Sequence, residues 1–338
     1  MSLLFQDTGR PQLSEQKDRP ILMWPTRSQD FINDLKKKNR TDISKKELFM
    51  ALNVKKMHPL FVAEVTGVNI TEPLTAEIQS ELQSLIDRHG ILVFRDQEFT
   101  DEQQVVFSRY FGEIEIANNK NNITKQEDRR LSNMFSDISN LNKNDEVHEQ
   151  ESRQRIFNLG NRIWHSDSSF RPNPARYSLL SAREIPVKGG DTQYADMHSP
   201  YENLTSAMKE LIADLQCEHS LMHSRARLGM DYFTEQEKED FKPVLQPLVR
   251  THPATGRKSL FLASHAGRIV NWPVTEAKLL LEELTEMATQ REYVYTHQWK
   301  RYDLVMWDNR RTMHRATRFE DTKEKRDMRR TTVAGDPA

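Results

Sequence analysis

The sequence predicts a mainly β protein with flanking helices, built around a double-stranded β-helix, or jelly-roll, core. Short runs rich in β-branched and aromatic residues recur in the second half of the chain, as in RYSLLSA, TQYAD, SLFLA, YVYTHQW and DLVMW. Glycine, proline or polar turns separate these runs, and no repeat of fixed period is visible. Helical patterns precede the runs and interrupt them. A strand-dominated core with helices before and beside it favours the jelly-roll architecture.

The first globular elements are a strand, a helix and a second strand. In LFVAEVTGVNI, β-branched residues followed by Gly67 indicate a strand with a turn. Thr75 can cap the helix that comes next, and Gly90 can end it. This helix has one apolar face, formed by Ile78, Leu82, Leu85 and Ile86. The run ILVFR after Gly90 is then expected as a buried strand.

Two further helices are expected. Thr100 and Gln103 form a capping-box pattern ahead of VVFSRYFG, which Gly112 can close. The segment EAKLLLEELTEMATQ predicts a helix between the later strands. Its stripe is expected to pack in the core and consists of Leu280, Leu281, Leu284 and Met287.

The chain divides into an extension, one large domain and an insertion. Of 338 residues, 36% are apolar and 29% charged, with a mean hydropathy of -0.77, so apolar residues must be concentrated in part of the chain. Residues 1–57 hold 12 Lys and Arg against 7 Asp and Glu, and we interpret them as a polar extension. Residues 58–336 form the expected domain. Within it, residues 117–155 are rich in Asn, Lys and acids and are expected as a long surface insertion.

Charge and cysteine content restrict the partners and the compartment. The formal net charge of -1 argues against overall attraction to nucleic acid or to a membrane. Cys217 is the single cysteine, so no internal disulfide can form, and the amino terminus lacks a signal-like apolar stretch. We therefore expect a cytoplasmic protein that binds neither nucleic acid nor membrane. The oligomeric state stays open, a homo-oligomer included.

A possible metal site begins in NRIWHSDSSF. His165 and Asp167, two residues apart at a strand end, would project to the same side, and His314 in WDNRRTMHRATRF is the best third ligand. Two imidazoles and one carboxylate on one face of an ion form the facial triad of non-haem Fe(II) oxygenases, which leaves positions open for oxygen chemistry. By itself, an isolated His-x-Asp is more often an ordinary hydrogen-bonded surface pair.

The wider sequence resembles the taurine and 2,4-dichlorophenoxyacetate dioxygenase (TauD/TfdA) family of Fe(II)/2-oxoglutarate oxygenases. The similar blocks cover roughly residues 58 to 336: AEVTGVNI, HGILVFRDQ, FGEIE, NLGNRIWHSDSSF, ARYSLLSA, GGDT, LVRTHPATGRKSLFLASHAGRI, DLVMWDNRRTMHRATRF and RRTTVAGD. Several lean toward the dichlorophenoxyacetate branch. The resemblance implies that His165, Asp167 and His314 ligate iron, with 2-oxoglutarate and O2 as co-substrates.

The resemblance also implies a clamp for 2-oxoglutarate. Members of the family bind the carboxylate of 2-oxoglutarate that lies far from the iron. They use a threonine from a Gly-Gly-Asp-Thr turn and an arginine beyond the distal histidine, which correspond here to Thr192 and Arg326. A guanidinium can hold a carboxylate with two hydrogen bonds, and a hydroxyl adds a third. The interval after His314 contains one apparent extra residue, so Lys325 competes with Arg326. RDMRRTT aligns better with Arg326.

The same resemblance supplies candidate substrate residues. Arg330 corresponds to an arginine near the iron that can meet the acidic group of the substrate, and Asn161 to a substrate-contacting amide. His252 matches a histidine that contacts substrate among relatives, and Trp307 a tryptophan beside the iron pocket. A structural role is an equally good interpretation of His252 and Trp307. After FGEIE, the segment IANNKNN offers no histidine where the taurine branch supplies one, which favours a small organic carboxylate.

The expected activity is oxidation of a C–H bond in a small anionic substrate, with release of succinate and CO2. Hydroxylation, desaturation, cyclisation and cleavage are all open outcomes. Two other functional classes compete: a zinc hydrolase that uses the same three ligands around a metal-bound water, and a non-catalytic jelly-roll protein that binds a small ligand. Neither alternative needs a 2-oxoglutarate clamp of Thr192 and Arg326, so the clamp distinguishes them.

Overall fold

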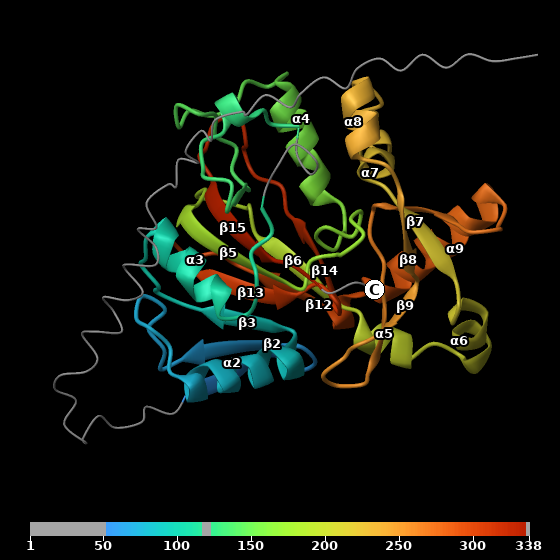
Figure 1. Cartoon of the computed structure of the whole chain (residues 1–338), viewed down its shortest axis with the longest axis horizontal. Helices are drawn as coiled ribbons and strands as arrows, with labels where there is room; N and C mark the ends of the chain where they lie inside the picture. Colours follow the sequence, from blue (N-terminus) through green and yellow to red (C-terminus); the bar gives the residue numbers. More distant parts are fainter. Residues whose placement is uncertain (1–51, 117–122, 336–338) are drawn as a thin grey trace, which may run out of the picture. The chain divides into compact units, whose positions relative to one another are not determined.

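The computed structural model describes residues 52–116 and 123–335, all within the compact unit Met50–Ala338. The structure is mainly β with helices around the sheets (Figure 1). Among the described residues, no helix is both long and apolar enough to cross a membrane.

The largest sheet has seven strands and contains much of the core. Its order is β1 (Asn53–His58), β2 (Val62–Thr66), β3 (Ile91–Phe94), β13 (Leu304–Asp308), β5 (Tyr177–Glu184), β15 (Asp327–Val333) and β4 (Ser136–Asp137). Neighbouring strands are antiparallel except for β2 and β3. A parallel pair needs a crossover connection, and α2 (Ala76–His89) supplies it here.

The amino-terminal caps of the first two helices and the glycine end of the first are confirmed, whereas the second helix ends at Arg109 with Tyr110 as its C-cap, before Gly112. Thr75 accepts a hydrogen bond from the backbone of Ile78 at the start of α2, and Gly90 ends the helix in the left-handed conformation at φ 74°. α3 (Asp101–Arg109) begins with the capping box of Thr100 and Gln103.

Both faces of the seven-stranded sheet are buried at its central strands β3, β13 and β5. Leu92 and Phe94 of β3 pack with α2 and α3, whereas Ile91 and Val93 point to the other face. Tyr194 packs in the same cluster as Ile91 and Val93, although its strand β6 belongs to another sheet. The alternation follows from the two-residue period of a strand, and it explains why ILVF is apolar at every position.

Three smaller sheets complete the strand arrangement of the described residues. Their orders are β12 (Val294–His297), β6 (Thr192–Asp196), β14 (Thr312–Ala316); β11 (Ala266–Ile269), β7 (Gln216–His219), β8 (Val244–Pro247); and β10 (Lys258–Leu260), β9 (Val249–Thr251). The long helix α9 (Val274–Ala288) buries Leu280, Leu281 and Leu284, with Met287 packed at the edge of the same cluster. The predicted core stripe is thus confirmed.

The remaining short helices carry at most local capping signals, such as the capping box of Thr234 and Glu237. They are η1 (Gln126–Asp128), α4 (Arg153–Asn158), η2 (Leu159–Arg162), α5 (His198–Glu202), α6 (Ser206–Ile212), α7 (Leu221–Ala226), α8 (Glu235–Asp240) and η3 (Arg291–Tyr293). In Figure 1, α4 and α7 lie beyond the strands on the side away from α2.

Two strands lie in regions that the sequence suggested were outside the folded core. β1 begins at Asn53, five residues before the domain boundary expected at His58, and it pairs antiparallel with β2. β4 lies inside the expected insertion 117–155 and pairs with β15. Both strands are at sheet edges and are exposed or half-buried, so their composition carries no apolar signal. Residues 1–51 of the expected extension and 117–122 of the insertion lie outside the described residues.

Candidate metal and substrate site

The loop that follows η2 is attached to β14 by the backbone. The His165 N–H donates to the carbonyl of His314 at 3.0 Å, and the His314 N–H donates back to His165 at 2.8 Å. The Ser166 hydroxyl adds a bond to the Thr312 carbonyl at 2.9 Å. This pairing brings together two segments that are about 150 residues apart in sequence.

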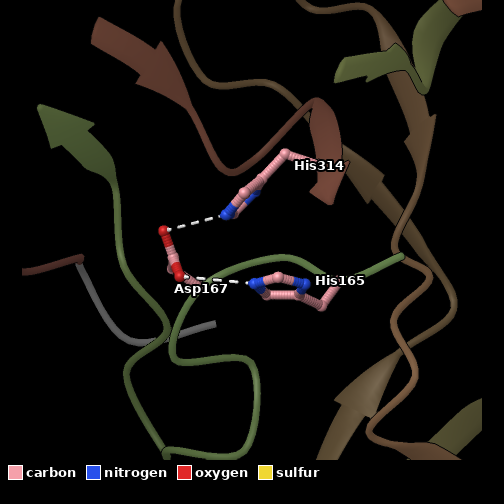
Figure 2. A group of neighbouring side chains, drawn as sticks. All are labelled: His165, Asp167 and His314. Atoms are coloured by element: carbon pink, nitrogen blue, oxygen red, sulfur yellow. Dashed lines mark ion pairs between the residues drawn. The ribbon is translucent and has the colours of Figure 1, made fainter. Parts of the chain in front are cut away.

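The three side chains predicted as metal ligands meet at this attachment. The side chains of His165, Asp167 and His314 point toward one another (Figure 2). Their ligand atoms all lie within 4.8 Å of one another, and all three residues are buried. Nε2 of His165 is 3.9 Å from Oδ1 of Asp167, and Nε2 of His314 is 3.7 Å from Oδ2. The spacing suits a single ion between the three residues, and the donor set is that of a non-haem iron facial triad.

Hydrogen bonding leaves one nitrogen of His165 available as a ligand. Nδ1 donates to the Ile163 carbonyl at 2.7 Å, so the lone pair of a neutral ring is on Nε2, the atom that faces Asp167. Burial lowers the pKa of both His165 and His314. Burial alone would raise the pKa of Asp167, but Arg330 and the two histidines lower it. Neutral imidazoles and an ionised carboxylate are the forms that bind a divalent metal.

Asp167 is oriented by Arg330, already predicted as a substrate residue, and by Ser178 and Asn309, which the sequence did not single out. Ser178 donates to Oδ2 at 2.7 Å, while Arg330 contacts Oδ1. Asn309 accepts from the Asp167 N–H at 3.1 Å and donates through Nδ2 to Ser178 at 3.0 Å. Trp307 donates to the same Asn309 oxygen at 3.0 Å. Partners that orient a ligand in this way tune metal affinity. The only sequence signal was the position of Asn309 in the turn before β14.

Arg326, one of the two predicted 2-oxoglutarate residues, is hydrogen-bonded to the turn that precedes the other, Thr192. Arg326 is buried; its Nε donates to the Gly190 carbonyl at 3.0 Å and its Nη1 to Ile138 at 3.1 Å. Gly190 is two residues before Thr192, whose hydroxyl accepts from Trp299 at 3.0 Å. Burial lowers the pKa of Arg326 to about 10, which leaves it cationic at neutral pH. Lys325 is exposed, so the placement favours Arg326 for this role.

Glycine is required beside Arg326. Gly190 has φ 72°, and a Cβ there would lie 3.3 Å from both Cδ and Nε of Arg326 and 2.8 Å from the ring of Pro186. The Gly-Gly-Asp-Thr turn therefore allows the guanidinium to approach the start of β6.

A cavity of about 80 Å³ opens beside the triad. Asn161 and Arg330, both predicted substrate residues, line it together with His165 and Asp167. A larger cavity of about 400 Å³ shares Asp137 and Asn158 with it and is lined mainly by residues of the insertion.

The other two predicted substrate residues lie elsewhere. His252 is buried, and its Nε2 is 2.9 Å from Oδ2 of Asp308, a residue outside the cavity lining. The Trp307 ring packs against His314 with ring centroids 4.7 Å apart, so Trp307 supports a metal ligand from behind. Asp87, His252 and Asp308 also lie close enough for a metal, but Arg310 already pairs with Asp308 at 2.6 Å. This second group is therefore an ion-pair cluster.

Sequence reasoning missed several cavity residues. His265 lines the cavity; its Nδ1 is 2.8 Å from the Ser169 hydroxyl, and its ring meets Phe170 edge to face at 4.8 Å. Arg225 of α7 also lines it. The block LVRTHPATGRKSLFLASHAGRI marked the neighbourhood of His265, whereas no motif marked Arg225.

Comparisons with known proteins agree with this site. Residues 53–332 match the family described as Taurine catabolism dioxygenase TauD, TfdA family. The chain is 40% identical to an alpha-ketoglutarate-dependent 2,4-dichlorophenoxyacetate dioxygenase of Burkholderia sp. (strain RASC), covering 85% of this chain and 95% of that protein. It is 35% identical to an (S)-phenoxypropionate/alpha-ketoglutarate-dioxygenase of Sphingobium herbicidovorans, covering 85% and 96%.

A solved structure is similar over the same length. The crystal structure of AAD-2 in complex with Mn(II) and N-oxalylglycine superposes with a TM-score of 0.83 at 51% identity, covering 85% of this chain and 99% of that one. Matches of this length and identity, together with the buried His-Asp-His set, establish that the chain belongs to the TauD/TfdA family of Fe(II)- and 2-oxoglutarate-dependent dioxygenases.

Proposed function

We propose that this enzyme oxidises an aryloxyalkanoic acid, an aromatic ether that carries a carboxylate, at the carbon between the ether oxygen and the acid. The observation that carries the proposal is a cavity lined by both metal ligands of the His-x-Asp pair and by the cation Arg330. Relatives that are 40% and 35% identical are named for phenoxyacetate and phenoxypropionate substrates.

The proposed roles follow from the contacts. His165, Asp167 and His314 hold Fe(II), while Thr192 and Arg326 bind the far carboxylate of 2-oxoglutarate. Fe(II) supplies the redox chemistry with which 2-oxoglutarate and O2 become succinate and CO2 while one oxygen atom enters the substrate C–H bond. A hydroxylated ether carbon is a hemiacetal, which breaks down to a phenol and a 2-oxo acid. The chain itself positions the reactants and excludes bulk water, since all three ligands are buried.

The substrate residues proposed for this cavity are Arg330 and Asn161, because both line it. Trp307 is proposed to support His314 rather than to contact substrate. His252 is not included, because its Nε2 is bonded to Asp308 and it does not line the cavity.

We also propose that the core is a jelly roll and that the protein is cytoplasmic. The jelly-roll core is supported by the two-layer packing of the seven-stranded sheet against β6. A cytoplasmic location is supported by the single cysteine, Cys217, which is buried and unpaired with another cysteine.

The test is a reaction with anaerobically reconstituted Fe(II) enzyme. We expect 2-oxoglutarate to produce a weak visible charge-transfer band, and phenoxyacetate with O2 to give phenol and succinate in equal amounts. Taurine should give little succinate. Phenol release with Zn(II) and without 2-oxoglutarate would instead favour a hydrolase, and the absence of any band or product with aryloxy acids would refute the proposal.

A further inference from the structure

Charged side chains around the cavity beside the triad are balanced, with one exception. In the described chain, each carboxylate of the cavity lining has an arginine partner: Glu115 pairs with Arg171, Asp167 with Arg330, and Asp137 with Arg130, which it shares with Asp145 and Asp327. Arg225 lines the same cavity but forms no ion pair with any carboxylate of the described residues. The cavity therefore has one cation whose charge the described chain does not neutralise.

Arg225 is held in place by uncharged neighbours. It lies in α7 and is only 5% exposed. Its Nη1 donates to the Ser224 hydroxyl at 3.2 Å, and its guanidinium carbon lies 4.3 Å from the centre of the Phe157 ring. Within the described residues, its Nε has no hydrogen-bond partner. Burial lowers the pKa of Arg225 to about 10, so the side chain still carries its charge at neutral pH.

Gly160 leaves the room that this guanidinium occupies. A Cβ at position 160 would lie 2.3 Å from Cζ and from Nη1 of Arg225. The glycine lies in η2, five residues before the metal ligand His165, so the same segment supplies the ligand and accommodates the cation. Burial of a cation without a counter-ion is unfavourable, and a site built in this way is suited to receive an anion.

Stacking on an aromatic ring does not by itself account for Arg225. Arg250 also stacks on a ring, with its guanidinium carbon 3.6 Å from the centre of Phe261, and burial lowers its pKa to about 10 as well. Arg250 does not line the cavity. Both guanidinium groups stack on an aromatic ring, but Arg250 is half-buried and only Arg225 lines the cavity, so Arg250 is a control for stacking.

We propose that Arg225 is an anion-binding residue of the substrate cavity and pairs with the acidic group of the organic substrate. The inference rests on the proposed function, since it takes this cavity to hold the substrate. Arg330 is available only in part, because its guanidinium already contacts the carboxylate of Asp167. Arg225 pairs with no carboxylate of the described residues, so its full charge is available to the substrate. Its guanidinium N–H groups are suited to bind a carboxylate.

The experiment measures binding rather than turnover. Full-length protein is loaded with Mn(II) and 2-oxoglutarate and titrated calorimetrically with phenoxyacetate and with its neutral analogue phenoxyacetamide. Arg225→Gln should weaken phenoxyacetate binding by about tenfold or more, the size of one charge-assisted hydrogen bond. It should leave phenoxyacetamide within about twofold of wild type. Arg225→Lys should recover part of the loss, and Arg250→Gln should change neither affinity.

The neutral analogue separates charge recognition from a structural role. Equal weakening of acid and amide in Arg225→Gln, or unchanged binding of the acid, would overturn the inference, as would a wild type that binds no phenoxyacetate. If Arg225→Gln does not fold, Arg225→Met puts an uncharged side chain of similar length beside Phe157 and is measured with the same expected result.

Turnover on the same preparations tests the proposed function separately. A wild-type enzyme that binds phenoxyacetate through Arg225 but forms neither phenol nor succinate with Fe(II) would refute the function and leave the anion site standing.

Discussion

Asp167 is held in place through both its side chain and its backbone. Its carboxylate contacts Ser178 and Arg330, and its backbone N–H is bound by Asn309. Ser178 and Asn309 are also bonded to each other, so the two contacts form one connected network. A metal ligand fixed in this way is preorganised before the ion arrives.

The first prediction concerns the three ligands. Replacing His165, Asp167 or His314 with alanine should abolish substrate-dependent succinate formation, because each loss opens the facial set. Succinate is measured after reaction with saturating Fe(II) and 2-oxoglutarate. His198→Ala is the control, since His198 is a buried histidine that does not line the cavity. Full turnover in any of the three ligand variants would rule out the assignment.

The second prediction concerns the 2-oxoglutarate clamp. Arg326→Ala should raise the KM for 2-oxoglutarate by roughly ten- to a hundred-fold, since a charge-assisted contact is worth about 1.5–3 kcal/mol. Lys325→Ala should change little, because Lys325 is exposed. Initial rates over a range of 2-oxoglutarate concentrations give both values. A raised KM for 2-oxoglutarate in Lys325→Ala, with an unchanged KM in Arg326→Ala, would mean that Lys325 rather than Arg326 binds the carboxylate.

The third prediction concerns Asn309 as a positioning residue. Asn309→Ala should weaken Mn(II) binding by about ten- to a hundred-fold, the usual effect of removing a group that orients a ligand. Metal affinity is measured by titration in the absence of substrate, together with the thermal midpoint. Asn203→Ala, which removes a bond to Tyr293 away from the cavity, is the control. Unchanged metal affinity in Asn309→Ala would exclude the positioning role.

The strands β14, β6 and β15 bring residues of the site together. β14 carries His314 and pairs with β6, where Tyr194 lies opposite His314 and Thr192 begins the strand. β15 carries Arg330, and Arg326 directly precedes it. Strand register therefore sets the separation between the metal ligands and the 2-oxoglutarate residues, because a one-residue slip would turn each side chain to the opposite face.

The fourth prediction concerns the amino-terminal boundary. Every proposed site residue lies between Asn161 and Arg330, so removal of residues 1–51 should leave Mn(II) and 2-oxoglutarate affinity within about twofold of the full chain. Removal of residues 1–58 also deletes β1, and the exposed edge of β2 should lower the thermal midpoint. Binding titrations and thermal unfolding of both truncations test this. Loss of binding in the shorter truncation would show that residues 1–51 contribute to the site.

Buried histidines affect the stability of the molecule as a whole. Burial lowers the pKa of His198 to about 4 and that of His219 to about 3, against 6.5 in an unfolded chain. Below pH 6.5 the unfolded state binds more protons than the folded state, so stability falls as pH falls, until the folded pKa is reached. Above pH 6.5 both states are neutral at these positions, and they contribute no pH dependence.

The fifth prediction follows from this linkage. The free energy of unfolding should decrease between pH 6.5 and pH 5, with each such histidine contributing about 1.4 kcal/mol per pH unit once its unfolded form is fully protonated. In the described chain, neither ring nitrogen of His219 has a hydrogen-bond partner, and the ring stacks on Phe261. His219→Phe should therefore make the pH dependence shallower by one proton. Denaturant unfolding at several pH values measures it, and an unchanged slope would contradict the explanation.

Local chemistry accounts for the parts of this protein that the sequence predicted. The capping residues Thr75 and Thr100, the terminal Gly90 and the apolar stripe of α9 act within a few residues of themselves, so their patterns identify helices directly. The ligands could be nominated because a His-x-Asp pair and a distant histidine match one kind of metal chemistry, and the family resemblance extended that set to Thr192 and Arg326.

Tertiary structure alone decided the rest. The edge strands β1 and β4 are polar, and only backbone pairing with β2 and β15 reveals them. Ser178 and Asn309 are ordinary polar residues in sequence, and His252 resembles a substrate residue until its bond to Asp308 is seen. The unbalanced charge of Arg225 depends on which carboxylates lie nearby. Burial and pairing are properties of contacts between distant segments, so no local pattern can encode them, whereas caps, stripes and ligand types are encoded residue by residue.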